Sequence, residues 1–413
     1  MKMIKVLVTL LVAAGLVLPV VAVAEDKLSI SGEFRVMGYS YDNYKDFDDK
    51  TDADDQDFFG QRLRLYSKYA VTEGVSIHTR MDFGETQWGV EGQNSVRYTH
   101  VGPDDEEFQL DRAFLEIKKG AFNIRAGQQY YGFGNSIAVD HQGTGFRVAY
   151  GGPVSVTGVW NKLDEGDSLN DDSVAGDKSN KDTDFYAGSV KYKNDAFAAE
   201  LFYGIIDDKA TDLEKSVIGL AASTQLGPVA LNGEFNYFDG DDGAAVKTDY
   251  VGTQLFLEGK MAAMDALTVG AQLYYAQGTD KTDEAQLSEI SDFGSWLPWE
   301  HGYLETDFGY GSYGTPFNAF GQNAGTISAL VFADFVATDD IGFKASIQYG
   351  TEEEDKLAEY DYMSYNVSAQ YKIADNTFVQ IQGNMLDRDL EIAGVDQPDD
   401  TATGVVARLI ANF

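Results

Sequence analysis

The sequence predicts an all-β protein, a transmembrane antiparallel β-barrel of about eighteen strands, with sixteen strands as the alternative. Three observations predict this fold class. The chain begins with the pattern of an export signal, and no later apolar run approaches the ~20 residues of a membrane helix. Most of the remaining chain alternates between apolar and polar residues, which is typical of strands with two unlike faces. The connections between these stretches are alternately short and long.

Residues 1–24 predict a signal peptide. Lys2 and Lys5 give it a positive start, an apolar run follows, and small residues end it at Ala24, where cleavage is expected. The alternative is an uncleaved membrane anchor. The mature chain, residues 25–413, is then expected to form a single barrel domain without a helical membrane span.

The strands are predicted from residue alternation. In residues 28–36, apolar residues and glycine occupy the even positions, while Ser29, Ser31, Glu33 and Arg35 occupy the odd ones. Such stretches match the ~9–11 residues that a tilted strand needs to cross a membrane. In lipid, every backbone polar group needs an internal partner, so a sheet of this kind has to close on itself. The predicted strands are 28–41, 59–70, 75–88, 108–118, 121–130, 144–150, 154–162, 182–193, 196–206, 214–226, 229–239, 247–259, 266–277, 325–337, 341–350, 361–373, 377–387 and 401–413.

Every second connection is short, and the connections between them are mostly longer and acidic. An outer-membrane barrel threads in this way, with short periplasmic turns and long outer loops. A β-sandwich would not sort its loop lengths so regularly. The short connections are Val71–Gly74, Lys119–Gly120, Gly151–Pro153, Asn194–Asp195, Gly227–Pro228 and Ala374–Asn376. The clearest acidic ones are Asp42–Phe58, Leu163–Lys181, Asp239–Val246 and Arg388–Asp400.

The net charge of −36 excludes a basic nucleic-acid-binding face. The absence of cysteine excludes disulfides and thiolate metal sites. Two interpretations of the acidic outer loops stay open. They bind divalent cations that bridge to anionic lipid and lipopolysaccharide, or they are simply solvated. Only four histidines occur, without metal-ligand spacing, and no hydrolase motif is present. The sequence therefore predicts no catalytic, cofactor or metal site, and the protein is not expected to be an enzyme.

Two stretches resemble a known family. Leu110–Gly134 contains a strand, a tight turn and a second strand with Arg125-Ala-Gly127-Gln128-Gln129, and the last strand alternates up to Phe413. Together they are similar to Gram-negative outer-membrane porins, either general porins or alginate-export-like barrels. The resemblance implies an outer-membrane location, an assembly signal at Phe413 for the barrel-assembly machinery, and a homotrimer. The best-known trimeric porins have sixteen strands and a long third loop inside the pore. Here the third outer loop, Tyr131–Gly143, is short.

The polar faces of the predicted strands give candidate pore-lining residues. The early strands carry arginines, and the later ones carry mainly amides and glutamates, so one wall is expected to be basic and the other polar to acidic. Charges inside a pore set its ion selectivity. Either the arginines favour anionic or polar solutes, or they pair with acidic loop residues to keep the interior polar. The candidates are Arg35, Arg62, Arg64, Arg80, Arg112, Arg125, Arg147, Glu234 and Glu258.

The longest connection, Gly278–Ala324, is rich in aromatic residues and is the best candidate for a plug or constricting loop. Because barrels of sixteen to eighteen strands leave an aqueous channel, the sequence predicts passive diffusion of small hydrophilic solutes and ions. One alternative is a substrate-specific channel or exporter for sugars or anionic polymers. Another is a structural or adhesive barrel.

Overall fold

A computed structural model describes residues 27–43, 56–88, 108–164, 182–243, 248–279, 284–286, 325–353, 358–392 and 394–413. The predicted signal peptide and most of the predicted plug, Gly278–Ala324, lie outside the described residues. Much of the predicted acidic connections also lies outside the described residues. In the described part of the chain, no helix is long and apolar enough to span a membrane.

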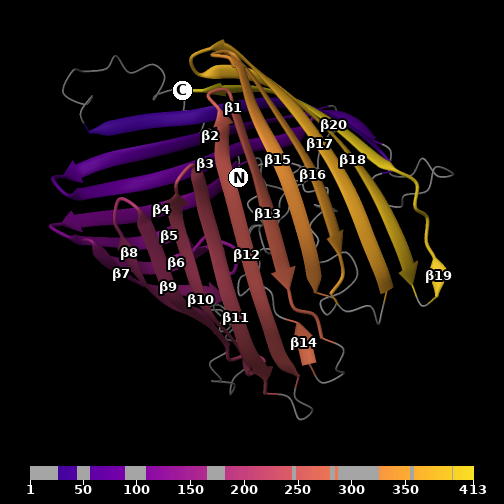
Figure 1. Ribbon diagram of the computed structural model, residues 1–413. Coiled ribbons are helices and arrows are strands. Elements are labelled where there is room, and N and C mark those ends of the chain that lie inside the picture. Colours follow the sequence, from indigo (N-terminus) through magenta and orange to yellow (C-terminus); the bar gives the residue numbers. More distant parts are fainter. Residues whose placement is uncertain are drawn as a thin grey trace.

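Eighteen strands close into an antiparallel barrel in which chain neighbours are also spatial neighbours, and the last strand pairs with the first (Figure 1). The predicted strand number is confirmed. Two short strands were not predicted; β14 pairs in parallel with β12, and β19 pairs with β18. The strands are β1 (Leu28–Asp42), β2 (Gln56–Thr72), β3 (Val75–Gln87), β4 (Phe108–Lys119), β5 (Phe122–Gly132), β6 (Asp140–Tyr150), β7 (Val154–Asp164), β8 (Thr183–Lys193), β9 (Phe197–Asp208), β10 (Leu213–Leu226), β11 (Val229–Asp242), β12 (Asp249–Met264), β13 (Leu267–Ala276), β14 (Glu284–Gln286), β15 (Thr326–Thr338), β16 (Ile341–Thr351), β17 (Ala358–Ala374), β18 (Thr377–Ile392), β19 (Val395–Asp396) and β20 (Ala402–Asn412).

The barrel closes through backbone hydrogen bonds at its last residue. The amide of Gly32 donates to the carbonyl of Phe413 at 2.7 Å, and the amide of Phe413 donates back at 3.0 Å. Phe413 is 56% exposed. A Cβ at Gly32 would come within 2.6 Å of the Phe413 ring and of the Arg64 carbonyl oxygen, so the close approach of the strands requires glycine here.

The connections at the two ends of the barrel differ as predicted. At one end, each turn between consecutive barrel strands contains two or three residues, as in the turn between β10 and β11. At the other end, the connections are mostly longer, and β14 and β19 lie there (Figure 1). With an even number of barrel strands, the first and last strands both have their chain-terminal ends on the short-turn side, which is the periplasmic side of such barrels.

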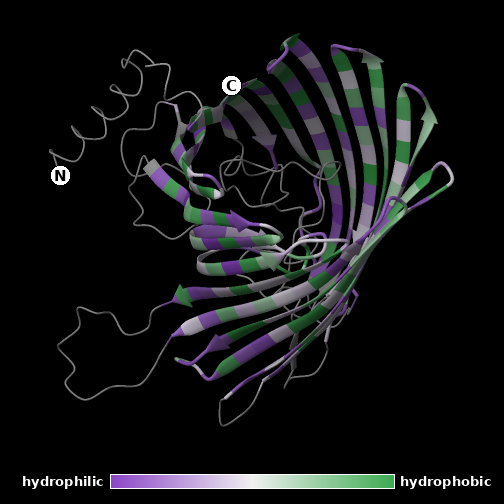
Figure 2. Ribbon diagram, turned by 90° about the vertical axis from the view of Figure 1, so that its left-hand side faces the viewer, coloured by the Kyte–Doolittle hydropathy of each residue, from purple (hydrophilic) through white to green (hydrophobic). Residues whose placement is uncertain are grey.

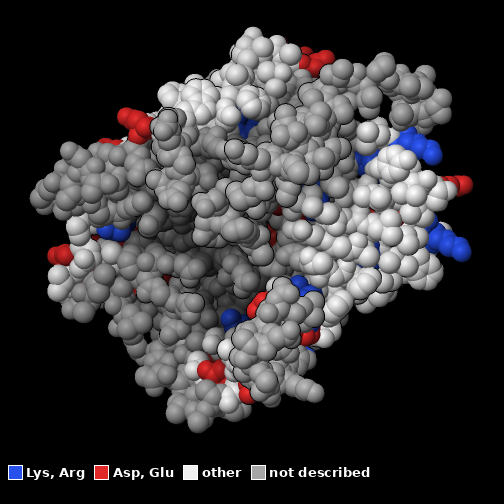
Figure 3. Space-filling model, turned by 180° about the vertical axis from the view of Figure 1, so that it is seen from behind, with Lys and Arg blue, Asp and Glu red and all other residues white. Residues whose placement is uncertain are grey.

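The two faces of each strand have different polarity (Figure 2). On β15, Ile327 and Val331 are exposed on the outside, whereas Ser328 on the inner face is buried. In the space-filling view, uncharged surface covers the described strands on the right, with charged side chains at its outer edge (Figure 3). Many large apolar side chains are exposed on the outer faces of the strands, as is typical of a barrel that faces lipid. The register between strands therefore assigns the polar positions to the interior.

One hairpin leaves the barrel wall. The pairing of β4 with β5 stops at Ala113 and Gln128, and the pairing of β6 with β7 stops at Thr144. Beyond these points β5 and β6 pair only with each other, up to Gly132 and Asp140. We call residues 129–143 the inward hairpin, because the side chains that they contact belong to the inner faces of other strands.

Candidate functional site

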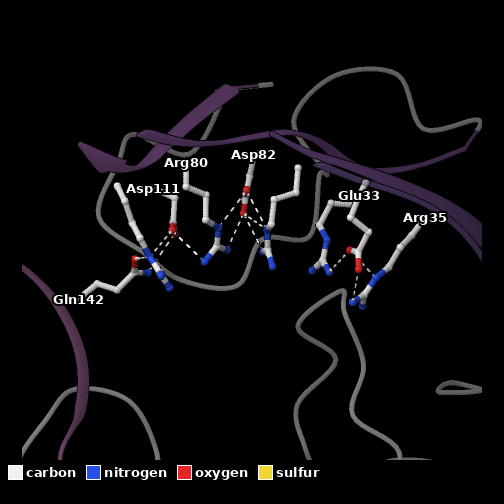
Figure 4. Close-up of polar contacts among 9 residues, drawn as sticks. Glu33, Arg35, Arg80, Asp82, Asp111 and Gln142 are labelled. Carbon is white, nitrogen blue, oxygen red and sulfur yellow. Dashed lines mark hydrogen bonds and ion pairs between the residues drawn. The ribbon is translucent and has the colours of Figure 1, made fainter. Parts of the chain in front are cut away.

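A row of arginines and carboxylates follows the inner faces of β1 to β4 (Figure 4). At one end of the row, Glu33 on β1 accepts from Arg35 at 2.6 Å and from Arg62 on β2 at 3.2 Å. The single carboxylate thus holds two guanidinium groups that the register places directly opposite each other. Without it, like charges in directly opposite positions would destabilise the strand pair.

The row continues through two further carboxylates. Asp82 on β3 accepts from Arg64 and Arg80, each at 2.8 Å. Asp111, at a bulge in β4, accepts from Arg80 at 2.9 Å and lies 3.4 Å from Arg112. The Asp111 side chain is 5% exposed and that of Asp82 is 9% exposed. These charges are therefore largely desolvated, and each depends on its partners.

Arg112 also joins the row to the inward hairpin. Its Nε donates to Gln142 at 3.2 Å, and its guanidinium lies 5.0 Å from the centre of the Tyr130 ring. Gln142 in turn donates to Asp111 at 3.0 Å. The base of the hairpin is thus fixed to the charged row by hydrogen bonds and a cation–π contact.

Removing one bridging carboxylate is expected to destabilise the barrel strongly. Asp82→Asn leaves the largely buried Arg64 without its counter-charge and leaves Arg80 with Asp111 alone, which costs about 3 kcal/mol for a buried ion pair broken on one side. Urea unfolding in detergent micelles measures the change. Asp339→Asn, in an exposed turn, is the control and is expected to unfold as the natural protein does. Equal midpoints for the two variants would contradict this account.

A second cluster surrounds Glu116 on β4. Its Oε1 accepts from Asn123 and from Arg125, both at 3.0 Å. Its Oε2 lies 3.0 Å from Lys118 Nζ and 3.4 Å from His78 Nε2. The Glu116 side chain is 3% exposed, while that of Lys118 is 57% exposed. One buried carboxylate therefore serves two full cations and a histidine from three strands.

Arg147 on β6 differs from the other arginines. The register places it directly opposite Arg125, and these two residues form one of three pairs of arginines that face each other on neighbouring strands. In the described part of the chain, no carboxylate forms an ion pair with its guanidinium, whereas Arg125 is bound to Glu116. The three opposite pairs are Arg35 with Arg62, Arg80 with Arg112, and Arg125 with Arg147.

The inward hairpin reaches along the inside of the barrel to β11. Glu234 on β11 accepts backbone hydrogen bonds from Asn135 and Ala138 at the hairpin tip. Asn232 donates to the Asn135 side chain at 3.0 Å. Gly134 has a φ of +61°, and a Cβ there would collide with the Glu234 carboxylate. The tip therefore wraps around one carboxylate, in a conformation that glycine adopts easily.

Apolar contacts hold the same hairpin. Along one side, the Tyr131 ring stacks on Phe185 of β8 at 5.0 Å, and the Phe133 ring stacks on Phe202 of β9 at 5.9 Å. At the tip, Ile137 is buried in one cluster with residues of β12 and β13, including Phe256. These contacts bury aromatic and aliphatic area inside an otherwise polar lumen, and each ring pair adds about 1 kcal/mol beyond its area.

The structure shows where each predicted site residue lies. All seven arginines, Glu234 and Glu258 are on inner faces. Glu258 accepts from Gln272 at 2.7 Å. Glu234 is only 2% exposed, because the hairpin covers it, so it holds the hairpin and does not face the open lumen. The third connection, although short, folds inward as part of the inward hairpin.

Sequence reasoning missed the carboxylates that pair with the arginines. In the described contacts, the carboxylates that pair with the arginines are on strands. The signal was present in part, because Glu33 and Asp82 occupy the same alternating polar positions as the arginines beside them. The wall from β11 to β17 is mainly neutral, with amide and hydroxyl contacts such as Gln254 to Tyr274 at 2.6 Å and Gln348 to Tyr362 at 2.9 Å. Among the described residues, no carboxylate or histidine group is arranged to hold a metal ion.

Comparisons with known proteins agree with this architecture. The sequence model of Gram-negative porins matches residues 8–291. The fold is similar to that of OccK9 (OpdG) from Pseudomonas aeruginosa, with a TM-score of 0.61 and 13% identity over 94% of this chain and 99% of that one. It is also similar to OprD from Pseudomonas aeruginosa, with a TM-score of 0.59 and 12% identity over 94% of this chain and 93% of that one. A BenF-like porin from Pseudomonas fluorescens is similar as well, with a TM-score of 0.59 and 9% identity over 94% of this chain and 99% of that one. No curated protein matches the sequence.

Proposed function

The chain belongs to the family of Gram-negative porins, and from this premise we propose that its outer-membrane channel, which passes small solutes, favours anionic and polar solutes over cations. Passage is by passive diffusion. The polarity of the lumen supports the proposal, because amides, hydroxyls and charged groups occupy the inner faces of the strands.

The observation that carries the proposal is the excess of positive charge on one wall. Seven arginines lie on the inner faces of β1 to β6, and four carboxylates bridge them in the described contacts. Arg147 is the one without an ion-pair partner there. A solute carboxylate or phosphate between Arg125 and Arg147 would take the bridging position that Glu33 takes between Arg35 and Arg62, with charge-assisted hydrogen bonds.

The direct experiment is a single-channel recording with the purified protein in a planar bilayer under a salt gradient. A reversal potential of the sign that indicates anion preference is expected, and liposome swelling should show faster entry of small organic anions than of cations of equal size. Cation preference would refute the selectivity proposal. The absence of any conductance would instead favour a structural barrel.

Other features of the family resemblance remain proposals. We propose that residues 1–24 are removed on export and that Phe413 is the assembly signal, since this residue is exposed beside Gly32. A homotrimer and divalent cations at the acidic loops remain predictions from the sequence.

A further inference from the structure

We propose that the protonation state of His78 sets how strongly the channel prefers anions as the pH changes. His78 tunes this selectivity through its charged neighbours and forms no ion pair of its own with the solute. The inference rests on the proposed anion preference, because it concerns the size of that preference. His78 lies on the inner face of β3, and its side chain is 23% exposed. Histidine is the side chain whose charge ordinarily changes between pH 5 and 8.

Contacts with Phe114, Ser76 and Glu116 hold the ring in position. Its plane lies parallel to the Phe114 ring of β4, within 4° and with centroids 4.9 Å apart. Its Nε2 is 2.9 Å from the Ser76 hydroxyl and 3.4 Å from Glu116 Oε2. Arg125 lies 5.1 Å from the centre of the same Phe114 ring. The imidazole is thus held against the carboxylate on which the neighbouring cations depend.

The charged neighbours decide what protonation does. Lys68 on β2 is directly opposite His78, Glu116 and Lys118 face it from β4, and Arg125 faces it from β5. On β3 itself, Arg80 follows on the same face but is bound to Asp82 and Asp111. With neutral His78, the single negative charge of Glu116 offsets part of the charge of Lys118 and Arg125.

Protonated His78 competes with Lys118 and Arg125 for the Glu116 carboxylate. The imidazolium can donate to Glu116 Oε2, at the atom that Lys118 also approaches, so more of the charge of Lys118 and Arg125 is left uncompensated toward the lumen. One added unit charge about 7 Å from a passing ion, in a hydrated and screened pore, changes the anion-to-cation permeability ratio by about threefold. Anion preference is therefore expected to rise as pH falls.

The test measures reversal potentials of single channels from pH 8 to pH 5. The natural protein is expected to show about a threefold rise in the anion-to-cation permeability ratio, with one titration step. His78→Gln should keep the pH 8 ratio throughout, and His78→Lys should show the higher ratio at every pH. His141→Gln is the control, because His141 is also a largely buried histidine inside the barrel but lies in the inward hairpin, where it pairs with Tyr131, and this variant should titrate as the natural protein does.

Three results would overturn the inference: a flat profile in the natural protein, an unchanged titration in His78→Gln, or a titration abolished by His141→Gln. Folding of each variant is checked by its mobility on gels before and after heating, and His78→Lys gives an independent reading if His78→Gln does not fold. Failure of the proposed function looks different, because it appears as a lack of anion preference at pH 8 in all variants, whatever their pH dependence.

Discussion

Replacing residues 133–139 with a two-residue turn is expected to raise the single-channel conductance roughly twofold or more, because the hairpin tip is removed from a barrel that is otherwise wide enough for an aqueous channel. The tip now reaches from β5 and β6 to β11, β12 and β13, so it occupies part of the cross-section of the lumen. Planar-bilayer recordings measure the conductance, and swelling of liposomes with sugars of graded size measures the exclusion limit, which should increase as well.

Smaller changes at the contact with the wall separate the role of the tip from a general effect of shortening. Glu234→Gln keeps the volume of the side chain but weakens the charge-assisted hydrogen bonds from the hairpin backbone. It should give noisier openings and an intermediate conductance. The same two-residue turn in place of Lys209–Asp212, which connects β9 and β10 at the same end of the barrel, should leave the conductance unchanged. An unchanged conductance in the hairpin variant would mean that another segment constricts the pore.

Neutralising Arg125 and Arg147 together is expected to reduce the anion-to-cation permeability ratio by about ninefold, as two charges that each contribute about threefold. The pair is where the lumen carries least compensation, since only Glu116 forms ion pairs with it in the described contacts. The double variant Arg125→Gln, Arg147→Gln keeps long polar side chains and so limits the change in pore size.

Two exposed lysines near the periplasmic ends of the strands provide the control for a simple loss of two positive charges. Lys27→Gln with Lys119→Gln removes the same net charge from positions outside the arginine row. Its permeability ratio should stay within about twofold of the natural value, because charges outside the pore are screened over about 10 Å. If both double variants shift the ratio equally, the overall charge of the protein sets the selectivity and the wall does not.

Alternation in the sequence predicted most of the barrel because lipid outside and water inside impose it on every strand. The register between strands was not predictable in the same way. That Asp82 stands between Arg64 and Arg80, or that the bulge at Asp111 brings a fourth strand into the row, depends on pairings between segments that are distant in sequence.

The inward hairpin was not predictable from the sequence for a different reason. The short length of this connection does not decide whether it reaches the lumen, because the decisive feature is where strand pairing stops. Because β5 leaves the wall after Gln128, a short connection gains several residues of reach. Its apolar residues, among them Phe133 and Val139, are buried inside the barrel. Apolar residues in a connection that is expected to be exposed are the feature of the sequence that indicates this burial.

The arginine–carboxylate row also favours one register of these strands over its alternatives. A slip of β3 by one residue against its neighbours would turn Arg80 and Asp82 toward hydrocarbon and bring Met81 into the lumen. Each arginine misplaced at mid-membrane costs about 2–4 kcal/mol, and the bridges on both sides would be lost at the same time. Strands that share several such bridges therefore have one register that is much more stable than the others, and a barrel assembled in another register would be unstable.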